Sequence, residues 1–385
     1  MTHDLQQIIQ GFERLQAHPR SAAIATVVKT SGSVYRRPGA RMVLTADQQI
    51  IGGISGGCLE ADVWERVQPL LHQATDPIVF TYDTTASQDL VWGLGMGCNG
   101  MVQVLLESLQ TEAAIGSLQF ITDCWRQQQA GAIATIFHIT GSVNAQIGDR
   151  VLVNSNQTVV YGMADPPLVT RLLQDSDRSL ITGKNRVITY SLEHGSVEAL
   201  IEVIHPPVPL LVFGAGYDAV PVVQLAKQLG WQVTLIDHRP IYANRDRFPQ
   251  ADQIIVGHVD QIYHQIKLNE STIAVVMTHH YLQDQALLKL LLPSPIRYLG
   301  VLGPKSRTQQ LLQDLHHHGL QFTATQLQRL YAPIGLDLGA ETPDEIALAI
   351  VAEIQAVLNQ RSGHSLRDKA GAIHGDDQPC PVLVL

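Results

Sequence analysis

Two cysteines lie in separate glycine-rich stretches of the first half of the chain. Cys58 follows Gly56 and Gly57 in GGISGGCLEAD, at the expected start of a helix, and Cys98 lies in GLGMGCNG. The positive end of a helix dipole favours the thiolate form of a thiol, which is the reactive form. These residues therefore suggest two reactive thiols. Small buried cysteines that fill tight spots between glycines are the alternative.

A third loop, KTSGSVYRRPGARM over residues 29–42, carries Arg36, Arg37 and Arg41. A guanidinium group presents a planar fork of N–H donors that matches a phosphate group. These arginines are therefore candidate ligands of a phosphate-bearing molecule. A solvated loop with ordinary surface charges is the alternative.

The second half of the chain opens with a nucleotide-type motif. Gly214 and Gly216 lie in GAGYDA, between an apolar run and a helical stretch, and Asp237 ends the next apolar run. The glycines permit a tight turn that brings a helix N-terminus to a phosphate, and an acid about 20 residues later can bind a ribose. The motif predicts a Rossmann-like unit. Three possibilities remain open for this unit. It binds NAD(P), it binds another nucleotide, or it binds no ligand and the glycines serve only the turn.

His279 is the remaining candidate in the second half. It follows the apolar run IAVVM, at the end of an expected strand, where open α/β sheets bind ligands. The alternative is that Thr278 caps the next helix and the histidine is only exposed.

Apolar periodicity indicates which elements must position these residues. In the first half, short strands alternate irregularly with helices expected over residues 2–17, 58–74 and 111–129, which is typical of an α+β domain. After HPPVP, short apolar strands alternate with helices, as in a doubly wound parallel sheet. We therefore expect an α/β protein with an α+β domain over 1–204, a proline-rich linker over 205–209, a Rossmann-like domain over 210–360 and a flexible tail over 361–385. No internal repeat is expected.

Composition excludes several classes of protein. The 385-residue chain has a net charge of −9 at pH 7, which gives no attraction to nucleic-acid phosphates. No apolar run approaches the ~20 residues needed to cross a bilayer, and the N-terminus has no signal-peptide pattern. Four cysteines in so long a chain do not form a disulfide framework. We expect a cytoplasmic protein with no membrane and no nucleic-acid partner.

Taken together, the motifs resemble the xanthine dehydrogenase accessory factor family, the XdhC/CoxI group. Beside the three loops of the first half, the matching stretches are FGAG at 213–216, TH at 278–279, RYLGVLGPKSR at 297–307 and APIGLDLGAETPDEIA at 332–347. They occur in the family's own order. The resemblance implies an N-terminal domain joined to a C-terminal Rossmann domain.

The same resemblance implies a function. It points to an accessory factor that binds molybdenum cofactor (molybdopterin), supports its sulfuration with a cysteine desulfurase, and delivers it to a xanthine dehydrogenase-type molybdenum hydroxylase. It marks Cys58 and Cys98 as candidate molybdenum ligands or sulfur-contacting thiols. The family's glycine loop typically continues with His, where this chain has Tyr217 followed by Asp218.

Two other functions stay open. A nicotinamide-dependent oxidoreductase would use the Rossmann domain, but it needs an acid or base in the first half, where we find no strong His/Lys/Tyr constellation. A pure interaction module would use the glycine loops only as structure. We expect a cofactor-binding chaperone more than a metabolic enzyme, with a homodimer as the default assembly.

Overall fold

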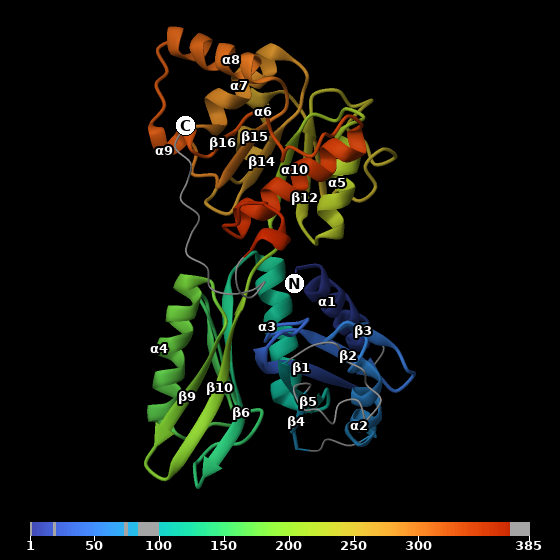
Figure 1. Ribbon diagram of the computed structural model, residues 1–385, viewed down its shortest axis with the longest axis vertical. Coiled ribbons are helices and arrows are strands. Elements are labelled where there is room, and N and C mark those ends of the chain that lie inside the picture. The colour runs from blue at the N-terminus through green and yellow to red at the C-terminus, as the bar shows by residue number, and fades with distance from the viewer. Residues whose placement is uncertain (1, 18–20, 73–75, 84–99, 370–385) are drawn as a thin grey trace. The chain divides into compact units, whose positions relative to one another are not determined.

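The computed structural model describes residues 2–17, 21–72, 76–83 and 100–369 (Figure 1). The chain divides into two compact units, Met1–Pro206 and Pro207–Leu385, and each is described by itself. Two five-stranded sheets lie in the first unit and a six-stranded parallel sheet lies in the second. The expected fold class, an α+β domain followed by a doubly wound parallel sheet, is confirmed.

Over its described residues, the first unit is built from two antiparallel sheets and four helices. Its helices are α1 (Thr2–Ala17), α2 (Glu60–His72), α3 (Glu112–Gln127) and α4 (Pro166–Thr182). Across the first sheet the strands are β3 (Ile50–Gly52), β2 (Arg41–Thr45), β1 (Ala22–Gly32), β5 (Gly100–Ser108) and β4 (Ile78–Asp83). Across the second they are β8 (Thr158–Tyr161), β7 (Arg150–Asn154), β6 (Gly131–Gly141), β10 (Gly195–Ile204) and β9 (Arg186–Leu192).

These two sheets are copies of one another. Each follows a helix (α1 or α3), and the strand order β3-β2-β1-β5-β4 matches β8-β7-β6-β10-β9. Residues 23–45 align without a gap with residues 132–154, and both segments contain AIAT and GSV at the same places. Register agrees as well, since Thr26 pairs with Arg41 and Thr135 with Arg150. The first unit is therefore an internal duplication, and the expectation of no internal repeat is wrong.

The two repeats share a buried contact region. Val28 and Phe137 both lie where the strand register is interrupted, and they pack together with Leu105 and Leu200. Helices α1 and α3 contribute to one common apolar cluster with strands of both sheets. The other face of each sheet is covered by its own helix, which is α2 in the first repeat and α4 in the second.

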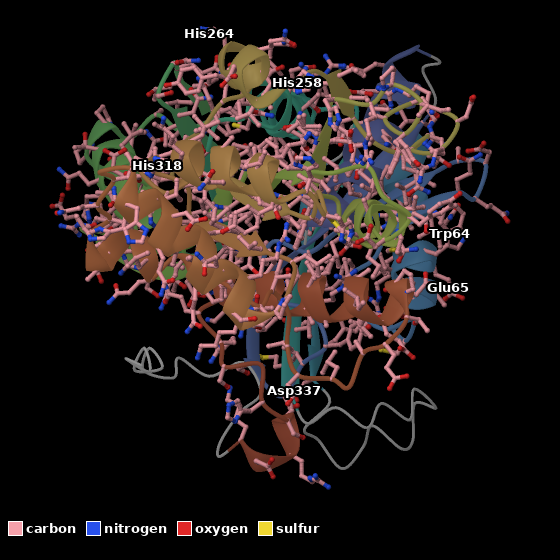
Figure 2. All side chains as sticks on the ribbon, turned by 90° about the horizontal axis from the view of Figure 1, so that it is seen from above. Trp64, Glu65, His258, His264, His318 and Asp337 are labelled. Carbon is pink, nitrogen blue, oxygen red and sulfur yellow. The ribbon has the colours of Figure 1, made fainter. Side chains whose placement is uncertain are left out.

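Helix α2 is amphipathic, and the packing of its apolar side fixes the position of its first turn. Val63, Val67 and Leu70 are completely buried against the first sheet. Glu65 is exposed on the other side of the helix, and the half-buried Trp64 packs at the border of the same apolar cluster (Figure 2). The helix is therefore anchored by packing along one stripe, and the loop before it is held at one edge of the sheet.

The second unit has helices on both faces of its parallel sheet. Across the sheet the strands are β13 (Gln253–Val256), β12 (Gln232–Asp237), β11 (Pro209–Phe213), β14 (Ile273–Val276), β15 (Tyr298–Val301) and β16 (Leu330–Tyr331). One face packs on α5 (Ala219–Gln228) and α10 (Pro343–Leu358). The other packs on α6 (Val259–Ile262), α7 (Tyr281–Leu291) and α8 (Lys305–His317), and a short α9 (Ala324–Leu327) follows. Strand order reverses between β11 and β14, which is where such sheets bind ligands. None of the described helices is long and apolar enough to cross a membrane.

Candidate functional site

The topology of the first sheet gathers the candidate loops at one edge. Strands β1, β3 and β4 end at this edge, and β2 and β5 begin there, because each neighbouring pair is antiparallel. The connections over residues 33–40, 53–59 and 84–99 therefore all leave from the same edge. Arg36, Arg37 and Cys58 lie on the first two. Cys98 lies on the third, outside the described residues.

The loop that carries Cys58 is closed by its own hydrogen bonds. Ser55 Oγ accepts the N–H groups of Gly57 (3.0 Å) and Cys58 (3.1 Å), and it donates to the Glu60 carboxylate. Glu60 also accepts the N–H of Ser55 (2.9 Å). Burial raises the pKa of Glu60, but the hydrogen bonds from Ser55 outweigh it and hold that pKa below its ordinary value. The half-buried thiol of Cys58, which forms no disulfide, is thus held in a defined loop directly before α2.

The arginine loop contacts the cysteine loop. The Tyr35 ring, 69% exposed, lies over Gly56, so that a Cβ at residue 56 would be 3.7 Å from the ring. A Cβ on Gly53 would lie 3.8 Å from Arg36 Nη2, and Arg36 Nη1 donates to Asp4 at 2.5 Å. Tyr35 and Arg36 therefore border the Cys58 loop, with one aromatic face open to solvent.

Arg41 differs from Arg36 and Arg37 in its surroundings. Arg37 is exposed on the same loop. Arg41 is 8% exposed and forms a bidentate ion pair with Glu202 of the second repeat. Its guanidinium also donates to the carbonyl oxygen of Gly39 at 3.0 Å. Arg41 therefore fixes the loop from inside the unit, whereas Arg36 and Arg37 belong to its outer side.

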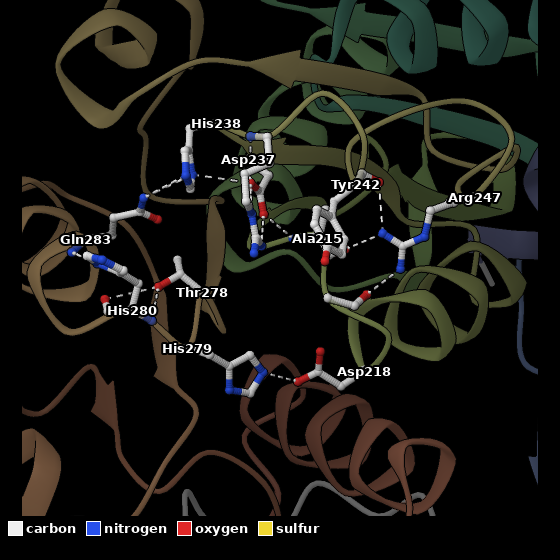
Figure 3. A network of polar contacts seen from close by, with 12 residues as sticks. Ala215, Asp218, Asp237, His238, Tyr242, Arg247, Thr278, His279, His280 and Gln283 are labelled. Atoms are coloured by element: carbon white, nitrogen blue, oxygen red, sulfur yellow. Dashed lines mark hydrogen bonds and ion pairs between the residues drawn. The ribbon is translucent and has the colours of Figure 1, made fainter.

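In the second unit the glycine motif forms the expected turn between β11 and α5. Gly214 has φ +115°, and a Cβ there would overlap the carbonyl oxygen of Met277, so only glycine fits. The N–H of Ala215 donates to Asp237 Oδ2 at 2.8 Å. Arg239 donates three further hydrogen bonds to the same carboxylate, at 2.9, 3.0 and 2.8 Å (Figure 3). The Asp237 carboxylate therefore binds both the glycine turn and the Arg239 side chain.

The protonation of Asp237 follows from these contacts. Burial raises its pKa, and the hydrogen bonds from Arg239 and Ala215 lower it by more, so the net pKa is below the ordinary value. A carboxylate has about four acceptor positions, and four internal donors already use them. A ribose hydroxyl would have to compete with Arg239 for this residue.

His279 and Asp218 meet across the reversal of strand order. His279 Nε2 lies 2.7 Å from Asp218 Oδ2, and His279 has a left-handed backbone with φ +57° (Figure 3). The preceding Thr278 donates to Asp284 at 2.5 Å, and Arg307 binds the same carboxylate at 2.7 Å. These buried contacts fix the segment that carries the strained histidine.

The N-terminus of helix α7 is capped by His280 and not by Thr278. Its N-cap is His280, whose Nδ1 accepts the N–H of Gln283. Thr278 bonds to Asp284 instead, so the alternative of a capping Thr278 is wrong.

A small hollow of about 20 Å³ opens beside the Gly214 turn, at the carboxyl ends of β11 and β12. His238 and His258 line it, with ring centroids 5.0 Å apart, and Gln283 Nε2 lies 3.0 Å from His238 Nδ1. Phe213, Ile236 and several other apolar side chains form the remaining walls.

Sequence reasoning missed Tyr35, Ser55, Glu60 and Glu202. Glu60 carried no capping-box signal, because it lies five residues after Ser55 and not three. Glu202 carried no local signal, since its partner Arg41 is 161 residues away in the chain. Within the described ranges, no group of three or more His, Cys, Asp or Glu side chains could hold a metal ion.

Fold and loops together define a class: a two-unit protein in which a duplicated α+β unit with thiol and arginine loops is joined to a Rossmann unit. The chain belongs to the XdhC and CoxI family. Residues 15–83 match the XdhC and CoxI family, and residues 210–354 match the XdhC Rossmann domain. The first of these matches ends at β4, within the first repeat.

Three relatives support this assignment. The chain is 34% identical over 346 residues to a probable xanthine dehydrogenase subunit of Bacillus subtilis (strain 168), covering 89% of this chain and 95% of that protein. A crystal structure from Bacillus halodurans, described as a xanthine dehydrogenase, gives a TM-score of 0.75 at 28% identity and covers 94% and 98% of the two chains. The molybdenum cofactor insertion chaperone PaoD of Escherichia coli (strain K12) is 20% identical over 357 residues, covering 93% of this chain and 90% of PaoD.

Proposed function

We propose that this protein is an accessory factor that binds molybdenum cofactor as cargo and passes it to a xanthine dehydrogenase-type client. The observation that carries the proposal is the closed loop that presents Cys58 beside Tyr35 and Arg36. The kinship with PaoD, whose name states a molybdenum cofactor insertion chaperone, supports it. Such a role needs a site that binds and releases, and no proton-transfer machinery.

Each side chain at this edge suits one part of the cofactor. The Cys58 thiolate is a soft ligand for molybdenum. Arg36 and Arg37 supply donors for the phosphate of the pterin. The exposed face of Tyr35 offers a stacking surface for the ring. Cys98, on the third connection of the same edge, would be the second thiol.

Comparison of the two repeats supports a role for these loops beyond folding. In the first repeat β3 and α2 are joined by residues 53–59, and in the second β8 and α4 are joined by the shorter stretch 162–165. Likewise, β4 and β5 are joined by residues 84–99, where β9 and β10 need only Glu193 and His194. Both connections that carry a cysteine are therefore longer in the first repeat than the shared fold requires.

The competing function, a nicotinamide-dependent oxidoreductase, fits the second unit poorly. Asp218 places a carboxylate immediately before α5, where a pyrophosphate would bind, and Asp237 is already occupied by internal donors.

The remaining parts of the proposal concern partners. We assign sulfuration to a cysteine desulfurase acting on the bound cofactor, with Cys58 and Cys98 as the thiols in contact. The cytoplasm is the proposed compartment and a homodimer the proposed assembly, both from the sequence expectations above.

The test is the molybdenum and pterin content of the protein purified from a host that makes the cofactor. Wild type should carry both, Cys58→Ser should lose both, and the matched Cys124→Ala should keep them. Cys124 is a suitable control because it is buried in α3, where burial raises its pKa to about 11. Folded wild-type protein without molybdenum or pterin would contradict the proposal.

A further inference from the structure

The two repeats of the first unit hold each other's loops in a reciprocal way. Arg41 of the first repeat binds Glu202 of the second, and Arg150 of the second binds Glu107 of the first. These are equivalent positions, because Glu107 pairs with Ile24 and Glu202 with Ile133, the matching residues of β1 and β6. Each repeat therefore supports the connection between the first two strands of the other.

The loop glycines show how close this support is. Gly39 has φ +98°, and a Cβ there would lie 2.8 Å from Glu202 Oε1 and 3.1 Å from Asn185 Nδ2. Gly148 is its equivalent, with φ +92°, and a Cβ there would lie 2.7 Å from Pro77 Cγ. The loop that contains Arg36 and Arg37 is thus supported from behind by residues of the second repeat.

The reciprocity breaks at the positions that precede β4 and β9. Asn185 precedes β9 as Pro77 precedes β4, since Arg186 pairs with Ile201 and Ile78 with Leu106. Pro77 has no hydrogen-bond donor. Asn185 does, and it uses both ends of its amide.

The two contacts of Asn185 join the loop to a strand of the second sheet. Its Nδ2 donates to the carbonyl oxygen of Pro38 at 3.0 Å, and its Oδ1 accepts the N–H of Val203 at 2.9 Å. The arginine loop is therefore tied to β10, and only the ring of Pro77 packs at the matching place in the second repeat.

We infer that the second repeat is a positioning element, and that Asn185 and Glu202 are the residues through which it fixes the arginine loop beside Cys58. The inference rests on the proposed function. It means that the first repeat carries the loops that bind cargo, whereas the second repeat holds the arginine loop in place. In the second repeat the place of Arg36 and Arg37 is taken by Ala145 and Gln146.

Asn185→Asp separates positioning from folding. An aspartate keeps the acceptor for the N–H of Val203 but turns a carboxylate oxygen toward the Pro38 carbonyl, where no donor remains. One lost hydrogen bond changes an equilibrium about three- to tenfold. We expect Asn185→Asp to release molybdenum three- to tenfold faster than wild type, with faster amide exchange over residues 33–40, while the protein stays folded and its unfolding midpoint falls only slightly. Pro77→Ala, at the equivalent position, should match wild type in release and in exchange over that loop.

The possible outcomes distinguish this inference from the proposed function. If wild type holds molybdenum but Asn185→Asp releases it at the wild-type rate, the positioning role is overturned and the proposed function stands. Unchanged exchange over residues 33–40 in Asn185→Asp overturns the anchoring itself, whatever the cargo. If wild type holds no molybdenum, the proposed function fails, and the positioning role fails with it. Equal effects of Pro77→Ala and Asn185→Asp overturn the asymmetry between the repeats.

Discussion

Arg41 and Glu202, from different repeats, form an ion pair whose side chains are 7% and 8% exposed. Arg150 and Glu107 form the equivalent pair with 4% and 3% exposed. A buried pair is costly to desolvate, and it is stable only while both partners are present. The two pairs therefore make each repeat depend on the other for its native structure.

Loss of one partner should destabilise the first unit strongly. Arg41→Met leaves the Glu202 carboxylate buried without its cation, at a cost of about 3–5 kcal/mol in the free energy of unfolding. The double variant Arg41→Met/Glu202→Leu removes both charges and should recover most of that loss. Urea unfolding of the three proteins checks this. A single variant as stable as wild type would show that the pair contributes nothing.

Gly214 should tolerate no side chain. A Cβ there would overlap the carbonyl oxygen of Met277, and φ +115° is itself unfavourable for L-residues. Gly319 is a matched control, because it has φ +80° but a Cβ would meet nothing within 4 Å. We expect Gly319→Ala to cost about 1 kcal/mol and Gly214→Ala clearly more, measured by thermal or urea unfolding. Equal losses for the two variants would contradict the clash.

Local patterns explain which parts of the fold were predictable. The first helix was expected over residues 2–17 and is Thr2–Ala17, because its apolar periodicity needs no tertiary partner. The glycine turn at Gly214 was also predictable, because its motif between an apolar strand and a helix is local. The duplication was visible in AIAT and GSV, but most other paired positions differ, many of them in residue type as in Arg36 and Ala145, which hides the repeat.

The rest depended on contacts that no short stretch of sequence contains. Arg41 was expected among phosphate ligands with Arg36 and Arg37, because all three lie on one loop. Which arginine faces inward is decided by Glu202, far away in the chain. Asp237 was likewise assigned to a ribose from its spacing alone, whereas Arg239 and the N–H of Ala215 occupy it.

Asp237 should make the second unit sensitive to acid. Its pKa in the folded protein is lowered, so it stabilises the fold at a pH above its unfolded value of about 3.9, and this contribution is lost as the pH falls through the folded value. Asp237→Asn should therefore lower the free energy of unfolding by about 2 kcal/mol near neutral pH, and the difference from wild type should shrink near pH 3. Urea unfolding at both pH values checks this, with the exposed Asp246→Asn as control. A difference that stays constant with pH would assign the effect to something other than the charge.

The last prediction concerns NAD. Ligand binding to the native state raises the unfolding midpoint by mass action, so thermal stabilisation reports even weak binding. The Asp218 carboxylate lies before α5 and next to His279, where it repels a pyrophosphate and competes for the positive end of the helix. We therefore expect millimolar NAD or NADP to leave the wild-type midpoint unchanged.

Removal of the Asp218 charge should allow the glycine turn to bind a pyrophosphate. In Asp218→Asn the pyrophosphate would meet the N–H groups of the turn and the start of α5 without an opposing carboxylate, so NAD should stabilise this variant measurably. Asp246→Asn, which removes an exposed charge elsewhere in the unit, should remain insensitive to NAD. Stabilisation of the wild type by NAD would instead mean that Asp218 moves aside on binding, and it would favour the oxidoreductase over the cofactor chaperone.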